Sequence, residues 1–175
     1  MTRPDPDNPV SFPVHVARLP KKGMAVTVEA DADQRAALAA VHGLRAVEAF
    51  RAWLEVTAWK QGGVRVEGRV EARIVQDCIV TLEPVEETVD EAVSALFLPE
   101  GSKLAAPKYS SEGEILLDAE GEDAPELFSG DTIDVGRLAE EFFALGINPY
   151  PRKPGVALDE GGGDGDEPRG PLYEK

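Results

Sequence analysis

The sequence predicts an α+β domain with an antiparallel β-rich core and two helices. Three observations predict this class: long runs in which every second residue is apolar, glycine-containing turns between those runs, and two helix-like segments that follow aspartates suited to capping. The sheet could curl toward a barrel. We expect one domain over residues 11–155, a disordered N-terminus over residues 1–10 and a disordered acidic tail over residues 156–175.

The first elements are a pair of strands and a helix. Every second residue is apolar in 12–16 and again in 24–28, and the turn-forming residues 20–23 lie between, so we expect a hairpin with a four-residue connection. Asp31 and Gln34 have the spacing of a capping box. An alanine-rich helix should follow to about His42 and end at Gly43 in the left-handed conformation.

Residues 44–60 fit two patterns. Leu44, Val47, Phe50 and Leu54 have helical spacing, whereas the apolar residues at even positions from 50 to 58 alternate as in a strand. We choose a strand from about Val47, because the glycines at 62 and 63 then supply a turn into the next strand.

The clearest strand runs from Val64 to Ile74. Its even residues are apolar or glycine, and its odd residues alternate between arginine and glutamate. Successive strand side chains point to opposite faces, so one face is buried and the other charged. A similar run from Val85 to Phe97 predicts another strand.

The last third of the chain reads as loops and one helix. We expect a mobile loop over Pro99–Gly113, a short strand over Glu114–Asp118 and an acidic segment rich in turns. Asp134 should cap a helix, and Pro149–Pro154 should end it as an extended, polyproline-like segment. The expected apolar stripe of that helix, backed by Phe143, is Val135, Leu138, Phe142 and Leu145.

Charge is concentrated in one block. The 175 residues carry a net charge of −15, and residues 83–141 hold 17 acidic and 3 basic residues. Such a block attracts basic partners and repels phosphate, although it could also serve solubility alone. With no apolar run near the roughly 20 residues of a membrane span, no signal-peptide pattern and one cysteine, we expect a cytoplasmic protein without membrane contact.

The sequence offers no catalytic, cofactor-binding or metal-binding set. The single cysteine and the two histidines, His15 and His42, lie on separate expected elements, which disfavours a zinc site. Neighbouring carboxylates such as Glu86 and Glu87 point apart on a strand. No glycine motif for phosphate follows a strand and opens a helix.

Three arginines, Arg65, Arg69 and Arg73, share one strand face and could contact RNA phosphates. Glu67 and Glu71 lie between them, so a salt-bridge ladder across strands explains the same pattern. The tryptophans at 53 and 59 could stack on bases beside this row, or pack on the sheet.

Two separated stretches carry a resemblance to a known family. The first is residues 68–72 followed by 76–85, ending in Cys-Ile-Val-Thr-Leu-Glu-Pro-Val; the second is residues 133–141 followed by 148–155. Together they resemble the YceD family of bacterial proteins, which is associated with accumulation and maturation of large-subunit ribosomal RNA. Some members have a Cys-x-x-Cys pair here, but this chain has Val75 at the first position, so a zinc or dithiol role does not carry over.

The resemblance implies a ribosome-biogenesis factor, and the lack of a catalytic pattern indicates that it is non-catalytic. With the acidic block, we expect it to bind a basic large-subunit ribosomal protein, an rRNA precursor or both. A general β-rich interaction domain unrelated to ribosomes and, least favoured, a nuclease that binds a metal through carboxylates are the alternatives. We expect Cys78 to be structural. The candidate partner-binding residues are Arg65, Arg69, Arg73, Cys78, Glu83, Pro84, Glu112, Glu114, Glu120, Glu122, Asp123, Tyr150, Arg152 and Lys153.

Overall fold

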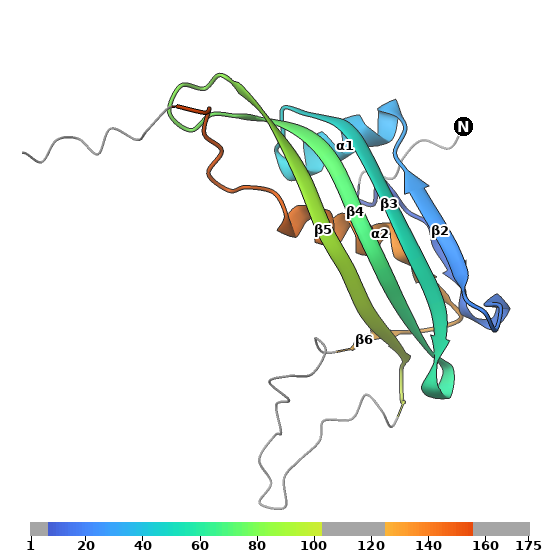
Figure 1. Ribbon diagram of the computed structural model, residues 1–175. Helices are drawn as coiled ribbons and strands as arrows, with labels where there is room; N and C mark the ends of the chain where they lie inside the picture. Colours follow the sequence, from blue (N-terminus) through green and yellow to red (C-terminus); the bar gives the residue numbers. More distant parts are fainter. Residues whose placement is uncertain (1–6, 103–124, 156–175) are drawn as a thin grey trace, which may run out of the picture.

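The computed structural model describes residues 7–102 and 125–155, and it confirms the α+β class (Figure 1). A five-stranded sheet has the order β2-β3-β4-β5-β6, and it is open because β2 and β6 form its two edges. The pairs are antiparallel except β5 with β6, which is parallel. The strands of this sheet are β2 (Met24–Glu29), β3 (Ala46–Trp59), β4 (Gly63–Asp77), β5 (Pro84–Pro99) and β6 (Glu126–Phe128).

Two helices, α1 (Ala32–His42) and α2 (Val135–Leu145), lie on one face of this sheet, behind it in Figure 1. The core lies between the sheet and these helices. Phe143 of α2 is fully buried, with its ring centroid 5.3 Å from that of Phe50 on β3 and 5.4 Å from that of His42. The opposite face, which we call the outer face, carries the charged side chains of β3 and β4.

Several structures predicted from local sequence patterns are present in the protein. Both halves of the capping box form at Asp31 and Gln34, with N–H···O distances of 2.8 Å, and Gly43 is left-handed with φ 64°. Residues 46–59 form a strand, as we chose, joined to β4 through the short 3-10 turn Lys60–Gly62. Gly68 then allows close pairing, because a Cβ there would lie 1.9 Å from the carbonyl oxygen of Trp53.

The expected N-terminal hairpin was wrong. Strand β1 (Pro13–His15) does not pair with β2; it pairs antiparallel with β7 (Thr132–Asp134), so that Val14 lies opposite Ile133. A 3-10 turn over Val16–Arg18 ends β1 early and redirects the chain, and β2 pairs with β3 instead. Alternation identifies a strand but does not choose its partner.

Residues 7–10, which we expected to be disordered, have a defined place. Val10 is 0 % exposed and belongs to the core. The amide of Asn8 donates to Asp134 Oδ2 over 2.8 Å. The ordered part of the chain therefore starts before residue 11; residues 1–6 and 156–175 lie outside the described residues, as do the expected strand at 114–118 and residues 103–113 of the expected loop.

Helix α2 is rotated relative to the expected stripe. Val135 and Leu138 are buried as expected, but Phe143 is buried in place of Phe142, which is half-buried, and Leu145 is 77 % exposed. Asp134 caps the helix by accepting from the N–H of Arg137. Strands β6 and β7, three residues each, were not expected, because so short a run shows no alternation. None of the helices in the described ranges is long and apolar enough to cross a membrane.

Candidate interaction site

The turn between β4 and β5, residues 78–83, is closed by its own backbone; we call it the Cys78 turn. The N–H of Cys78 donates to the carbonyl oxygen of Glu83, and the N–H of Leu82 donates to that of Cys78, each over 2.8 Å. Leu82 has φ 60°, a left-handed conformation that costs a non-glycine residue about 1–2 kcal/mol. Such strain persists only where the surroundings determine the conformation.

Those surroundings include the closing segment, residues 146–155, which returns from α2 to the Cys78 turn. The amide of Gln76 donates to the carbonyl oxygen of Asn148, and the N–H of Ile79 donates to that of Pro151, each over 2.9 Å. Lys153 Nζ pairs with Glu83 Oε2 at 2.5 Å. Two stretches about 70 residues apart in the sequence thus form one structural unit.

Cys78 is the centre of this unit. Its side chain is 0 % exposed, and its sulfur accepts the N–H of Lys153 over 3.4 Å. A hydrogen bond from the Thr81 side chain, with further ones from the N–H groups of Lys153, Thr81 and Val80, lowers the pKa of the thiol from 9.0 to about 7. The sulfur therefore fastens the closing segment to the turn, and its enclosure keeps bulky reactants away.

The same unit presents apolar side chains to solvent. Four side chains are exposed: Ile79 at 42 %, Val80 at 41 %, Leu82 at 73 % and Tyr150 at 68 %. Asp77, Glu83 and Glu86 are exposed nearby in the sequence. We call Ile79, Val80, Leu82 and Tyr150 the apolar patch. Exposed apolar side chains on a turn held by hydrogen bonds, with carboxylates close in the sequence, have the composition of a protein-binding surface.

The arginine row lies on the outer face of β4. Arg69 makes a two-pronged ion pair with Asp90 of β5 and lies 3.4 Å from Glu71 Oε1. The hydrogen bond from Arg69 lowers the pKa of Asp90. The salt-bridge ladder thus accounts for Arg69, while the guanidinium of Arg65 lies 6.0 Å from the ring centroid of Trp59.

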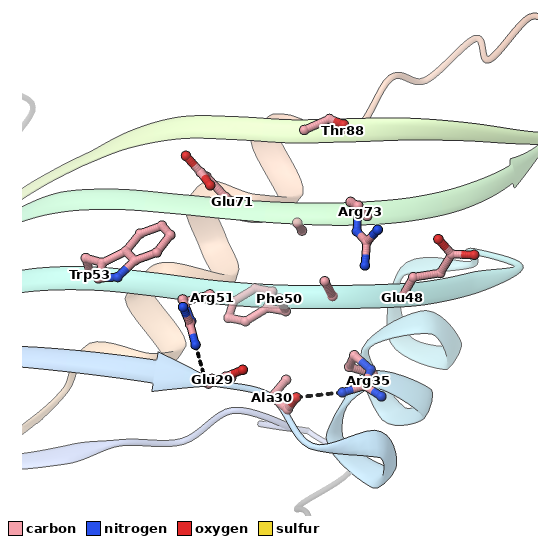
Figure 2. A pocket seen from close by; sticks show the side chains of 12 residues that line it. Glu29, Ala30, Arg35, Glu48, Phe50, Arg51, Trp53, Glu71, Arg73 and Thr88 are labelled. Atoms are coloured by element: carbon pink, nitrogen blue, oxygen red, sulfur yellow. Dashed lines mark hydrogen bonds and ion pairs between the residues drawn. The ribbon is translucent and has the colours of Figure 1, made fainter.

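Arg73 borders a hollow of about 560 Å³ on the same face (Figure 2). The pairing of β3 with β4 shifts by one residue at this place: Val47 lies opposite Ile74, but Ala49, not Glu48, lies opposite Arg73, so a small side chain occupies the position beside the arginine. Figure 2 shows Trp53 at one end of the hollow and Arg73 reaching from β4 toward β3. Arg51, also in its lining, is paired with Glu29 at 2.7 Å.

A comparison with known protein families identifies the family of this chain. The family model described as "Large ribosomal RNA subunit accumulation protein YceD" matches residues 66–170. The chain belongs to the YceD family. No curated protein and no solved structure gave a significant match.

The match to the YceD family begins in β4 and spans the Cys78 turn, β5, α2 and the closing segment. The matched region therefore contains both the Cys78 turn and the closing segment, and it leaves out β1 to β3 and α1. In the described ranges of this YceD protein, no three side chains of His, Cys, Asp or Glu gather as a metal-binding group.

The structure brings six of the candidate residues together and separates the rest. The candidates gathered at the Cys78 turn and the closing segment are Cys78, Glu83, Pro84, Tyr150, Arg152 and Lys153. Arg65, Arg69 and Arg73 form a separate row along the outer face. Five acidic candidates lie outside the described residues: Glu112, Glu114, Glu120, Glu122 and Asp123.

Sequence reasoning missed the apolar patch of this YceD protein. Its signal was present, because Ile79 and Val80 lie in a turn, where glycine, proline and polar residues are the usual choice. The hollow was missed too. It lies beside the register shift between Val47 and Ala49, and the pattern of apolar residues in the sequence does not reveal such a shift.

Proposed function

We propose that this protein is a non-catalytic ribosome-biogenesis factor that promotes accumulation or maturation of large-subunit rRNA by binding a basic ribosomal protein, an rRNA precursor or both. The observation that carries the proposal is the match to the YceD family over residues 66–170. The apolar patch on the Cys78 turn supports the proposal, because exposed apolar side chains of this kind suit protein binding.

Charge favours the basic protein as the direct partner. Residues 83–102 contain six acidic residues and no basic one, and they follow the apolar patch directly. An acidic surface attracts a basic protein at long range and repels a phosphate backbone. The arginines that could offset this repulsion are partly engaged, since Arg69 is paired with Asp90 and Arg51 with Glu29.

A contact with rRNA would use a different place. Arg73 makes no ion pair within the described part of the chain, and it borders the same hollow as Trp53, whose side chain is 40 % exposed. A base stacked on Trp53 could place its phosphate near Arg73. The double variant Trp53→Ala and Arg73→Ala tests this arm by its binding to an rRNA precursor fragment.

The first experiment is co-purification together with deletion. Tagged protein isolated from cells should bring large-subunit proteins or rRNA precursors with it, and deletion should lower the amount of large-subunit rRNA relative to small-subunit rRNA. Absence of both results would overturn the proposal.

A second experiment addresses the acidic block. Neutralising Glu112, Glu114, Glu120, Glu122 and Asp123 together should slow association with a purified basic large-subunit protein more than it speeds dissociation. The effect should fade with salt, because screening shortens from about 30 Å at 0.01 M to about 8 Å at 0.15 M. The matched control neutralises five carboxylates outside the block: Asp5, Asp33, Glu48, Glu55 and Glu67. Equal effects of the two sets would show that only net charge matters.

A further inference from the structure

Among residues 7–102 and 125–155, strand β5 has an open edge along most of its length. Its partner on one side is β4, over residues 84–97, whereas β6 pairs only with Phe97–Pro99 on the other side. Figure 1 shows β5 as the outermost long strand, with β6 at one end of it. The stretch from Glu86 to Leu96 would span roughly 33 Å in an extended strand.

Two hydrogen bonds establish which backbone groups of β5 point outward. At one end, the N–H of Cys78 donates to Glu83, so this odd-numbered residue faces β4. At the other end, the N–H of Glu100 donates to the carbonyl oxygen of Phe128, on the side away from β4. Backbone groups alternate sides along a strand, so the even-numbered residues between these ends face away from β4. They are Glu86, Thr88, Asp90, Ala92, Ser94 and Leu96, and we call their N–H and C=O groups the β5 free edge.

Within residues 7–102 and 125–155, no backbone or side-chain group pairs with the β5 free edge. An open edge is a template for another strand, and proteins usually block it with proline, a bulge or charge. Here the register with β4 is regular throughout, and proline occurs only at the two ends of β5, Pro84 and Pro99. Charge is the remaining protection.

That charge has one sign. Glu86, Glu87, Asp90 and Glu91 lie on β5, which has no basic residue. A second copy of this chain, with its own net charge of −15, would bring carboxylates against these carboxylates. The protection is therefore selective, because it opposes self-pairing and favours a basic strand.

The inner side of β5, which faces α2, also limits which side chains a bound strand could carry. The end of α2 lies against β5, since a Cβ on Gly146 would be 2.6 Å from Val89 Cγ1 and 2.7 Å from Glu91 Cγ. The neighbouring Leu145 is 77 % exposed and Phe142 is half-buried. A strand added beside β5 would place alternate side chains on this inner side, where Leu145 offers an apolar contact beside Glu87 and Glu91. Its other side chains would lie on the outer face, where Glu86 and Asp90, the latter shared with Arg69, favour basic residues.

We propose that the β5 free edge binds, by strand addition, an extended segment of a basic protein in which lysine or arginine alternates with apolar residues. Main-chain hydrogen bonds to the six even-numbered residues would supply affinity, and the two faces would supply specificity. The ribosomal identity of that protein rests on the function proposed above, whereas the edge and the chemistry of its ligand do not.

Amide hydrogen exchange of the full chain, read residue by residue by NMR, tests the edge without a variant. In the free protein the amides of Thr88, Asp90, Ala92 and Ser94 should exchange quickly, and those of Val89 and Val93 slowly. The probe is a synthetic peptide of about ten residues in which lysine alternates with valine. The peptide should slow the hydrogen exchange of the even-numbered amides. Its control has the same composition with lysines and valines in two blocks. Even-numbered amides that are already protected, or that stay fast with peptide bound, would overturn the proposal.

A variant pair tests the hydrogen bonds themselves. Proline at residue 92 removes an outward N–H and leaves the ladder to β4 intact, so Ala92→Pro should fold, as judged by circular dichroism, and bind the peptide about tenfold more weakly or worse. Ala92→Thr keeps the N–H and should bind as the wild type does. Equal binding by the two variants would overturn the proposal. If Ala92→Pro fails to fold, the exchange measurement decides alone.

The two proposals fail separately. Peptide binding at the edge, together with normal large-subunit rRNA after deletion, would remove the ribosomal role and leave the edge. Loss of rRNA after deletion, rescued fully by folded Ala92→Pro that no longer binds the peptide, would support the ribosomal role and remove the edge from it.

Discussion

Replacement of Asp134 should loosen the N-terminal segment from α2. One carboxylate oxygen accepts the N–H of Phe12 at 2.8 Å and that of Arg137 at 3.0 Å. The other accepts the amide of Asn8 at 2.8 Å and the hydroxyl of Ser11 at 2.6 Å. One side chain thus caps the helix and holds residues 8–12 against it.

The expected loss follows from these four hydrogen bonds. Asp134→Ala removes a helix cap, worth about 1 kcal/mol, and charged hydrogen bonds worth about 1.5 kcal/mol each at the lower end of their range. Because the site is only partly buried, we expect a loss of about 3 kcal/mol in the free energy of unfolding for Ala. Asp134→Asn keeps an acceptor for Phe12 and Arg137, so about half that loss is expected.

The loss should depend on pH in a defined direction. Burial by itself raises the pKa of Asp134, but the hydrogen bonds from Ser11, Phe12, Arg137 and Asn8 outweigh it, so the pKa lies below its ordinary value of 3.8. A carboxyl whose folded pKa is lowered stabilises the protein above its unfolded pKa, and that contribution is lost as pH falls through the folded pKa. The difference between wild type and Asp134→Asn should therefore be largest near neutral pH and shrink below about pH 4.

Urea unfolding followed by circular dichroism at neutral pH and near pH 3 measures both effects. Asp33→Asn is the matched control, because it removes one carboxylate from the first turn of α1, where Asp31 and not Asp33 is the cap. A loss below about 0.5 kcal/mol for Asp134→Ala, or a difference that does not change with pH, would refute the reasoning.

Four further predictions concern β4, the Cys78 turn and the closing segment. Gly68→Ala should cost more than about 3 kcal/mol in the free energy of unfolding or prevent folding, because the new Cβ would lie 1.9 Å from the carbonyl oxygen of Trp53; a normal melting temperature would contradict the tight pairing of β3 with β4. Cys78→Ser should retain large-subunit rRNA accumulation in cells, and complete loss with a normal fold would revive a role for the thiol. Because the thiol pKa is lowered to about 7 from 9.0, wild type should gain stability over Cys78→Ser as pH rises from 7 to 9, and a constant difference in urea unfolding would argue against a thiolate there. The Glu83–Lys153 pair is half-exposed on both sides, so a double-mutant cycle with Glu83→Gln and Lys153→Met should give a coupling in the free energy of unfolding that does not differ measurably from zero; a clear coupling would mean that the pair itself holds the closing segment in place.

Local chemistry explains what the sequence could predict. The capping box at Asp31, the left-handed Gly43 and the alternation of β4 each depend on residues close in the chain, and each was read correctly. The pairing of β1 with β7 joins residues about 120 positions apart, and no local pattern of alternation encodes that choice. The rotation of α2 that buries Phe143 and exposes Leu145 is set by packing against Phe50 and His42, which a helical stripe does not reveal.

The candidate site shows the same division. Family resemblance pointed to both the Cys78 turn and the closing segment, and the match to the YceD family confirmed the resemblance. Their mutual contact, through the sulfur of Cys78 and the N–H of Lys153, is a long-range feature that required the structure. The apolar patch and the β5 free edge were missed, because one depends on a strained turn and the other on the absence of a neighbouring strand within the described residues.

The bond between Cys78 and Lys153 also constrains the order in which the protein can be completed during its synthesis. Residues 46–99, which contain the three long strands, are synthesised before α2 and the closing segment. A nascent chain at that stage has its Cys78 thiol without the N–H of Lys153, and its β4–β5 hairpin without α2 beneath it. Contacts between residues far apart in the sequence form slowly, so the sheet passes through an unfinished stage with apolar surface accessible to chaperones or to association. The closing segment, residues 146–155, is the last of these elements to be synthesised. Its hydrogen bonds to the Cys78 turn therefore form only after the strands and α2 have been made.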